Sequence, residues 1–189
     1  MKNFYFKSIL LLTSGSMLGQ IIGFIGSMIM TRMYTTSEIG IMTTIVSISG
    51  IFAPVINARF DFALVKEQKE IYIFALVKMS IYIGVILSML ISLASYIYFI
   101  GIEGFISPFL SIFFVFLILV IQAFSNVFKS YNNNIGDFKT MTSVIVMRRF
   151  AEEISMAIFG LMGWKAVGLL ISRVIGQYFG MKREIVNIK

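Results

Sequence analysis

The chain contains apolar runs that are too long for an ordinary soluble fold. Residues 8–30 include no charged side chain over 23 positions, and an α-helix needs roughly 20 residues to cross the hydrocarbon core of a bilayer. Of the 189 residues, 58% are hydrophobic and 13% are charged, about half the charged share of a soluble domain. These features predict an integral membrane protein.

The first apolar run is preceded by two Lys and could be mistaken for a signal peptide. It is longer than the apolar region of such a peptide, so we interpret it as a helix that stays in the protein. Alternating strand patterns are absent, which argues against a membrane β-barrel. The sequence therefore predicts an all-α, polytopic membrane protein: one six-helix transmembrane bundle over residues 1–189, with spans at 8–30, 39–62, 76–98, 106–128, 140–162 and 165–182.

The distribution of Lys and Arg predicts the orientation of these spans, because cytoplasmic loops are rich in basic residues. With both termini in the cytoplasm, the inner ends carry ten basic residues and the outer loops two. A different topology makes 148–153 a loop and 154–176 one span, but it places Lys165 in the middle of the membrane. The inner ten are Lys2, Lys7, Lys66, Lys69, Lys78, Lys129, Lys139, Lys182, Arg183 and Lys189, and the outer two are Arg32 and Lys165.

Several spans contain polar side chains at membrane depth. A charge there costs a few kcal/mol and marks functional residues more often than structural ones. The segment "VMRRFAEEIS" (146–155) has four such charges and predicts two i,i+4 pairs on its helix, Arg148–Glu152 and Arg149–Glu153. The other candidates are Asn57, Arg59, Asp61, Gln122, Asn126, Arg173 and Gln177.

This polar set lies toward the inner half of the predicted bundle, which indicates a cavity open to the cytoplasm. Arginine suits a phosphorylated ligand there because its planar fork bonds two oxygens at once. The alternative is structural: pairs that neutralise each other, or side chains that reach the interface. Asn57 and Asp61 are four residues apart and are expected on one helix face.

Small residues recur every four positions in the first and last spans. Such stripes let helix backbones approach closely in a membrane, and a surface on which helices slide is the alternative interpretation. Pro54 should kink the second span, since it removes a helix hydrogen bond. The stripes are Gly15, Gly19, Gly23 and Ser27, and Gly168, Ser172, Gly176 and Gly180.

The composition also limits the chemistry. The chain has no Cys and no His, which removes thiolate chemistry and the commonest metal ligand. No catalytic constellation or phosphate-binding glycine loop is visible, so we predict neither an enzyme nor a cofactor or metal. The net charge of +7 is spread between apolar runs, which argues against a nucleic-acid partner.

Three stretches resemble a known transporter family. They are "LTSGSMLGQIIGFIGSMIMTRMYTTSEIGIMTTIVSISGIFAPVINARFDFALV" (12–65), "IQAFSNVFKSYNNNIGDFKTMTS" (121–143) and "GLMGWKAVGLLISRVIGQYFG" (160–180). In this order and spacing they resemble the N-terminal lobe of polysaccharide and O-antigen flippases, which belong to the multidrug/oligosaccharidyl-lipid/polysaccharide exporter superfamily.

The resemblance implies a multi-pass protein of the bacterial cytoplasmic membrane that moves an undecaprenyl-pyrophosphate-linked oligosaccharide between leaflets during surface polysaccharide synthesis. Its expected partners are membrane lipid and that lipid-linked oligosaccharide. The residues expected to bind pyrophosphate and sugar are Arg59, Arg148, Arg149, Arg173, Gln122, Asn126 and Gln177, and those expected to balance charge or couple an ion are Asp61, Glu152 and Glu153.

One departure from the family concerns length. Its members have about twelve or more spans in two lobes, whereas six are predicted here. Alternating access needs two lobes, so we expect a truncated product, a second lobe as partner, or a homo-oligomer. Other functions stay open: a drug or cation exporter of the same superfamily, and a non-transporting scaffold or decayed fragment.

Overall fold

The computed structural model describes residues 2–101 and 107–185, and in this part of the chain every regular element is an α-helix. The predicted all-α class is thereby confirmed. The start of the fourth predicted span at 106, and Lys189, lie outside the described residues. The helices are α1 (Lys2–Met33), α2 (Thr36–Phe52), α3 (Phe60–Lys66), α4 (Glu70–Ile100), α5 (Pro108–Asn134), α6 (Phe138–Leu161) and α7 (Lys165–Ile185).

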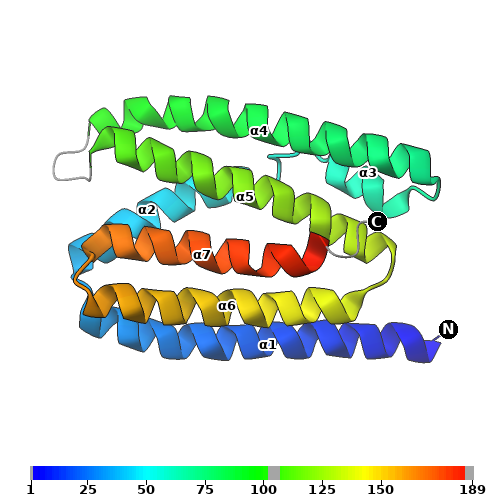
Figure 1. Cartoon of the computed structure of the whole chain (residues 1–189), viewed down its shortest axis with the longest axis horizontal. Coiled ribbons are helices and arrows are strands. Elements are labelled where there is room, and N and C mark those ends of the chain that lie inside the picture. Colours follow the sequence, from blue (N-terminus) through cyan, green and yellow to red (C-terminus); the bar gives the residue numbers. More distant parts are fainter. Residues whose placement is uncertain (1, 102–106, 186–189) are drawn as a thin grey trace. The chain divides into compact units, whose positions relative to one another are not determined.

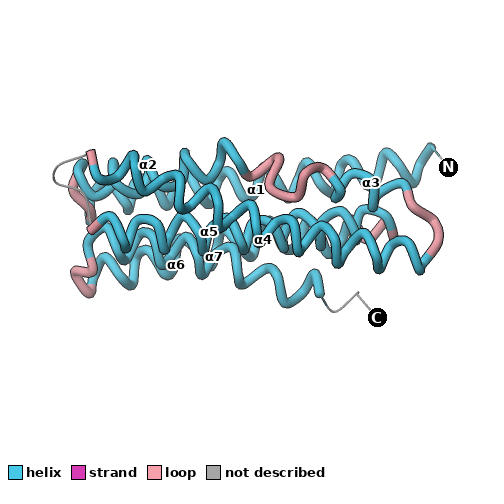
Figure 2. The backbone as a smooth tube through the Cα atoms, turned by 90° about the horizontal axis from the view of Figure 1, so that it is seen from above, coloured by secondary structure: helices cyan, strands magenta, loops and turns pink. Residues whose placement is uncertain are grey.

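Five of the six predicted spans correspond to one helix each, namely α1, α4, α5, α6 and α7. The second does not, because the helix expected over 39–62 is interrupted between α2 and α3 (Figure 2). Pro54 lies in the interruption, where Ala58 and Arg59 take left-handed backbone angles with φ of 48° and 64°. The kink expected at Pro54 is therefore a complete break, which the proline begins and two left-handed residues complete.

Within the described part of the chain, three helices are long and apolar enough to cross a membrane: Ser8–Met33, Glu70–Ile100 and Pro108–Asn134. The protein is therefore a candidate membrane protein by its helices as well as by its composition. The helix α2, with 17 residues, is apolar but shorter. Charged residues within α6 and α7 set these two helices apart from the three apolar ones.

The chain divides into two compact units. Unit 1 comprises Met1–Thr36 and Tyr131–Lys189, and unit 2 comprises Ser37–Ser130. In unit 1, α6 packs against both α1 and α7, and the three helices lie side by side (Figure 1). Tyr34 fixes one end of this layer, because its buried hydroxyl donates to the carbonyl of Met156 at 2.8 Å.

Unit 2 contains α2, α3, α4 and most of α5. The short helix α3 lies against α4 (Figure 1). Gly84 of α4 faces Ala123 of α5, and a methyl group added at Gly84 would lie 2.7 Å from the Ala123 Cβ. This close approach places the α4 backbone directly against α5.

The side chains of α4 are distributed in the opposite way from those of a soluble helix. Its buried face carries a stripe of small residues, and its exposed face carries large apolar residues such as Ile71, Tyr82 and Ile97, which are 83%, 73% and 80% exposed. Small polar residues inside and apolar residues outside are typical of a helix surrounded by lipid. The stripe consists of Ser80, Gly84, Ser88, Ser92 and Ser95.

Candidate functional site

The charged segment of α6 makes its strongest contacts with α7. Arg148 is bonded to Glu184 at 2.9 Å, and Glu152 accepts a bond from Arg173 at 2.6 Å. Glu152 also lies 3.6 Å from Arg149, one turn away on the same helix. Two ion pairs therefore join α6 to α7. In one of them α6 supplies the cation, Arg148, and in the other it supplies the anion, Glu152.

The pair predicted between Arg148 and Glu152 is wrong, and the pair predicted between Arg149 and Glu153 makes no contact within 4.0 Å among the described side chains. In the described residues Arg148 pairs with Glu184 and Glu152 pairs with Arg173. The spacing along a helix shows which side chains can meet, but pairs on one helix surface are worth only a few tenths of a kcal/mol. Partners from α7 approach the same charges in a drier environment, where the interaction is stronger.

Glycines on the neighbouring helices lie opposite these charged side chains. A methyl group added at Gly176 would lie 2.6 Å from the Cβ of Glu152, and one at Gly180 would lie 2.6 Å from the Nε of Arg148. On α1, a methyl group at Gly26 would collide with the carboxyl group of Glu153. The predicted close packing is confirmed at Gly15, Gly176 and Gly180, but not at Ser27, which is exposed; Gly26, outside the predicted stripe, makes room for the side chain of Glu153.

The two charges of α6 that face α1 are less fully paired than those that face α7. The Arg149 side chain is 44% exposed, whereas those of Arg148 and Arg173 are 22% and 24% exposed. Glu153 is half-buried and makes no ion pair within 4.0 Å among the described side chains. Arg149 and Glu153 are thus the members of this cluster best placed to meet a ligand.

Unit 2 contains a neutral polar network at the break between α2 and α3. The side-chain amide of Asn57, only 1% exposed, donates to the carbonyls of Ser80 and Ala123 at 3.1 and 3.2 Å. Asn126 donates to the carbonyl of Ala53 at 2.9 Å and to Asn57 at 3.3 Å. Gln122 donates to Asn126 at 3.1 Å. The network gives a partner to the Ala53 carbonyl at the break and to the side-chain amides of Asn57 and Asn126, as buried polar groups of an interrupted helix require.

Arg59 and Asp61 differ in exposure although they are two residues apart. The Arg59 side chain is exposed, and its guanidinium lies 4.9 Å from the centre of the Phe62 ring. Asp61 is 7% exposed, and its Oδ1 has no hydrogen-bond partner in the described part of the chain. The prediction that Asn57 and Asp61 share one helix face is wrong, because the helix is interrupted between them.

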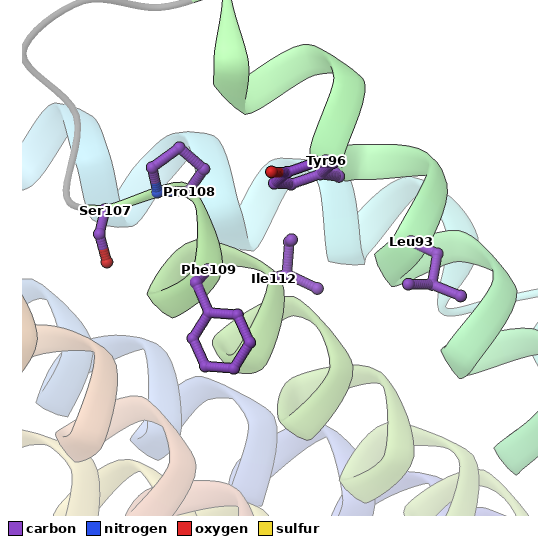
Figure 3. Close-up of a pocket in the computed structure, with 6 residues that line it drawn as sticks. All are labelled: Leu93, Tyr96, Ser107, Pro108, Phe109 and Ile112. Carbon is purple, nitrogen blue, oxygen red and sulfur yellow. The ribbon is translucent and has the colours of Figure 1, made fainter.

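Two further observations concern the predicted cavity. The Oε1 of Gln177 on α7 is buried without a hydrogen-bond partner among the described residues. A pocket of about 410 Å³ lies in unit 2 between α4 and the start of α5 (Figure 3). None of the predicted site residues lines it, and its mostly apolar wall suits a hydrocarbon chain better than a phosphate; the lining residues are Leu93, Tyr96, Ser107, Pro108, Phe109 and Ile112.

The sequence interpretation missed two features of these units. Glu184, the partner of Arg148, lies beyond the last predicted span and was not considered at membrane depth. The serine stripe of α4 was also missed, although its spacing of mostly four residues was visible in the sequence. Three of its hydroxyls bond to carbonyls of their own helix, at 2.6 to 2.8 Å; they belong to Ser88, Ser92 and Ser95.

Comparisons with known proteins add no relative. No protein-family model, no curated protein and no solved structure matches this chain.

Proposed function

We propose that this chain is one lobe of a multi-pass flippase in the bacterial cytoplasmic membrane, and that it moves an undecaprenyl-pyrophosphate-linked oligosaccharide between leaflets. The single observation that carries the proposal is the state of Arg149: its side chain is 44% exposed and has only one carboxylate partner among the described side chains. The other charged side chains of this α6 segment, Arg148, Glu152 and Glu153, lie against glycines of the neighbouring helices. A guanidinium whose carboxylate partner is 3.6 Å away keeps donors available for phosphate oxygens.

Arg59 supports the same proposal from unit 2. Its guanidinium is exposed and stacked on Phe62, an arrangement that leaves the edge of the fork free for a phosphate. By contrast, Arg148 and Arg173 already have close carboxylate partners. We therefore assign phosphate binding in unit 1 to Arg149, treat Arg59 as a separate phosphate-binding candidate within unit 2, and assign Arg148 and Arg173 to holding α6 against α7.

The balance of charge in unit 1 favours a second candidate, a drug or cation exporter of the same superfamily. Among the described side chains, three cationic and three anionic ones form the α6–α7 cluster, which gives no cationic surplus within that set; they are Arg148, Arg149 and Arg173, and Glu152, Glu153 and Glu184. A cationic substrate would use the carboxylate of Glu153 rather than the guanidinium of Arg149.

Complementation of export distinguishes these functions. Residues 1–189 are expressed in a flippase-deficient strain, alone and together with a compatible C-terminal lobe, and surface polysaccharide is measured. The flippase proposal predicts export in at least one of these cells. The exporter alternative predicts resistance to cationic drugs without surface polysaccharide.

Single substitutions then test the two arginines. Arg59→Ala and Arg149→Ala should abolish export while the amount of membrane-inserted protein stays unchanged. Arg32→Ala is the matched control, because Arg32 is exposed at the end of α1 and outside both polar sets. Full export by both arginine variants would refute their role in substrate binding.

A further inference from the structure

Glu153 lies in a space that exists because α1 has no side chain at residue 26. Its carboxyl group lies where a methyl group of residue 26 would be, and its Oε1 is 3.9 Å from the corresponding position at Gly23. We call this space the Gly23–Gly26 notch. A carboxylate held in such a place without a close cation is costly unless a hydrogen-bond donor reaches it.

Arg149 borders the same notch. Its Cζ and one terminal nitrogen lie 4.0 Å from the position that a methyl group of residue 23 would take. Arg149 and Glu153 are four residues apart on α6, so their side chains lie on one face, about one helical turn from each other. The face thus presents an open donor fork and an open acceptor side by side.

We propose that Arg149 and Glu153 form a two-part site for a sugar phosphate, in which Arg149 binds the phosphate and Glu153 accepts hydrogen bonds from the sugar. This inference rests on the proposed function and deepens it by naming Glu153 as the residue that determines specificity for the sugar. It differs from charge balance or ion coupling, because Glu153 here contacts the substrate.

The chemistry of the two groups fits this class of ligand. Most oxygens of a phosphate near neutral pH only accept hydrogen bonds, so the group needs the donors of a guanidinium. A sugar carries hydroxyl donors next to its phosphate, and a carboxylate makes about twice as strong a bond to such a donor as a neutral acceptor does. Phosphate without a sugar offers Glu153 no sugar hydroxyl and is repelled by its charge.

Gly26 acts as a positioning residue in this site. Alanine at 26 would occupy the notch and push the Glu153 carboxylate out of it. The neighbouring Gly23 provides a matched control, since a methyl group there would meet Glu153 and Arg149 only at 3.9 to 4.0 Å, an ordinary contact distance. The two substitutions lie on the same helix within one turn, but only the one at residue 26 collides with the carboxyl group of Glu153.

The test compares two probes on the purified full chain in detergent: glucose 1-phosphate and inorganic phosphate. Binding is measured by titration calorimetry, and the preference is the ratio of the two dissociation constants. The wild type should prefer glucose 1-phosphate about tenfold, the effect of one hydrogen bond to a charged group. Arg149→Gln should weaken both probes at least tenfold and leave their ratio nearly unchanged.

Glu153→Met keeps the length of the side chain and removes both acceptor oxygens. It should bring the preference close to one while inorganic phosphate binds at least as tightly as to the wild type. Gly26→Ala should reproduce this loss of preference, whereas Gly23→Ala should keep the wild-type ratio. Thermal unfolding of every variant confirms that the binding data come from folded protein.

Three results would overturn the inference. They are a wild type that binds neither probe, an unchanged preference in Glu153→Met, and equal effects of the two glycine substitutions. A further arm uses nanodiscs with and without phosphatidylglycerol, whose headgroup also joins a phosphate to hydroxyls. If that lipid displaces glucose 1-phosphate only when Glu153 is present, a lipid headgroup rather than a sugar phosphate is the ligand, and the proposal fails.

The export assay keeps the two proposals separate. Export that survives Glu153→Met, together with an unchanged probe preference, removes the specificity role and leaves the flippase proposal intact. A Glu153-dependent preference in a protein that never supports export leaves the sugar-phosphate site intact and removes the flippase proposal.

Discussion

Unit 1 buries ion pairs, whereas unit 2 buries mainly amides and hydroxyls, with Asp61 as a buried carboxyl group outside any ion pair among the described side chains. In unit 1, two ion pairs join α6 to α7, and glycines on both neighbouring helices make room for the long charged side chains. In unit 2, Asn57 at the break between α2 and α3 bonds to carbonyls of α4 and α5, Asn126 bonds to the carbonyl of Ala53 in that break, and serines line the buried face of α4. The two units therefore satisfy polar groups at depth by different chemistry.

The amide network of unit 2 and the ion pairs of unit 1 differ in whether they leave a polar group available for a ligand. A neutral amide donates and accepts in place, so the network of unit 2 is complete without a ligand. An ion pair needs a partner of opposite charge, and among the described side chains Glu153, on the face of α6 toward α1, has none within 4.0 Å. Unit 1 is therefore the better candidate for binding, and unit 2 the better candidate for holding a fixed shape.

The largest loss of stability is expected when unit 1 loses Glu152, whose carboxylate is shared by Arg149 and Arg173. Glu152→Ala removes the partner of Arg173 and the nearest carboxylate of Arg149, and a broken buried pair costs about 3 kcal/mol or more. We expect a lower melting temperature in detergent and less inserted protein. Replacing Glu152 and Arg173 together by Met should recover most of the loss; no recovery would show that α6 and α7 are not joined by this pair.

A smaller loss is expected where unit 2 loses its central amide. Asn57→Leu keeps the branched shape of the side chain but removes two bonds to carbonyls of α4 and α5 and leaves one N–H of the Asn126 amide without its acceptor, at a cost of about 2 kcal/mol. Gln122→Leu is the control, because it removes only the outermost bond of the network. Equal melting temperatures for the two variants would contradict the central position of Asn57.

The glycine stripes should respond according to the space around each glycine. A methyl group at Gly176 would lie 3.0 Å from the carbonyl oxygen of Arg148 and 3.1 Å from the Cα of Glu152, which are backbone atoms that cannot turn aside. Gly176→Ala should therefore cost about 1 to 2 kcal/mol. Gly50 of unit 2 has no atom within 4 Å of that position, so Gly50→Ala should be neutral or stabilise its helix by up to about 1 kcal/mol.

The smallest effect on stability is expected from cysteine pairs that test how α1 and α6 are aligned. The sequence contains no cysteine, so any disulfide that forms must come from the introduced cysteines. Gly15→Cys with Thr142→Cys should form a disulfide, because a Cβ at residue 15 would lie 3.3 Å from that of Thr142, near the usual separation. Met17→Cys with Thr142→Cys should not, since Met17 is 58% exposed. Gel mobility without reductant distinguishes them, and crosslinking of the second pair alone would refute the α1–α6 register.

Much of the helical architecture could be predicted from the sequence, because helices in an apolar chain follow local rules. Long runs without charge, such as residues 8–30, became single helices, and the turn at 162–164 separated α6 from α7 as expected. Pro54 marked the weak point of the second span. The complete break there could not be predicted, since it depends on Asn57 and Asn126 finding carbonyls on other helices.

The sequence by itself determined the helical class, the apolar exterior and the residues that carry charge and small side chains. These follow from composition and from spacing along a helix, which are local properties. Only the tertiary structure decided which partner each charge takes. Arg148 pairs with Glu184 and Glu152 with Arg173, because electrostatic energy depends on distance and burial in three dimensions rather than on separation along the chain.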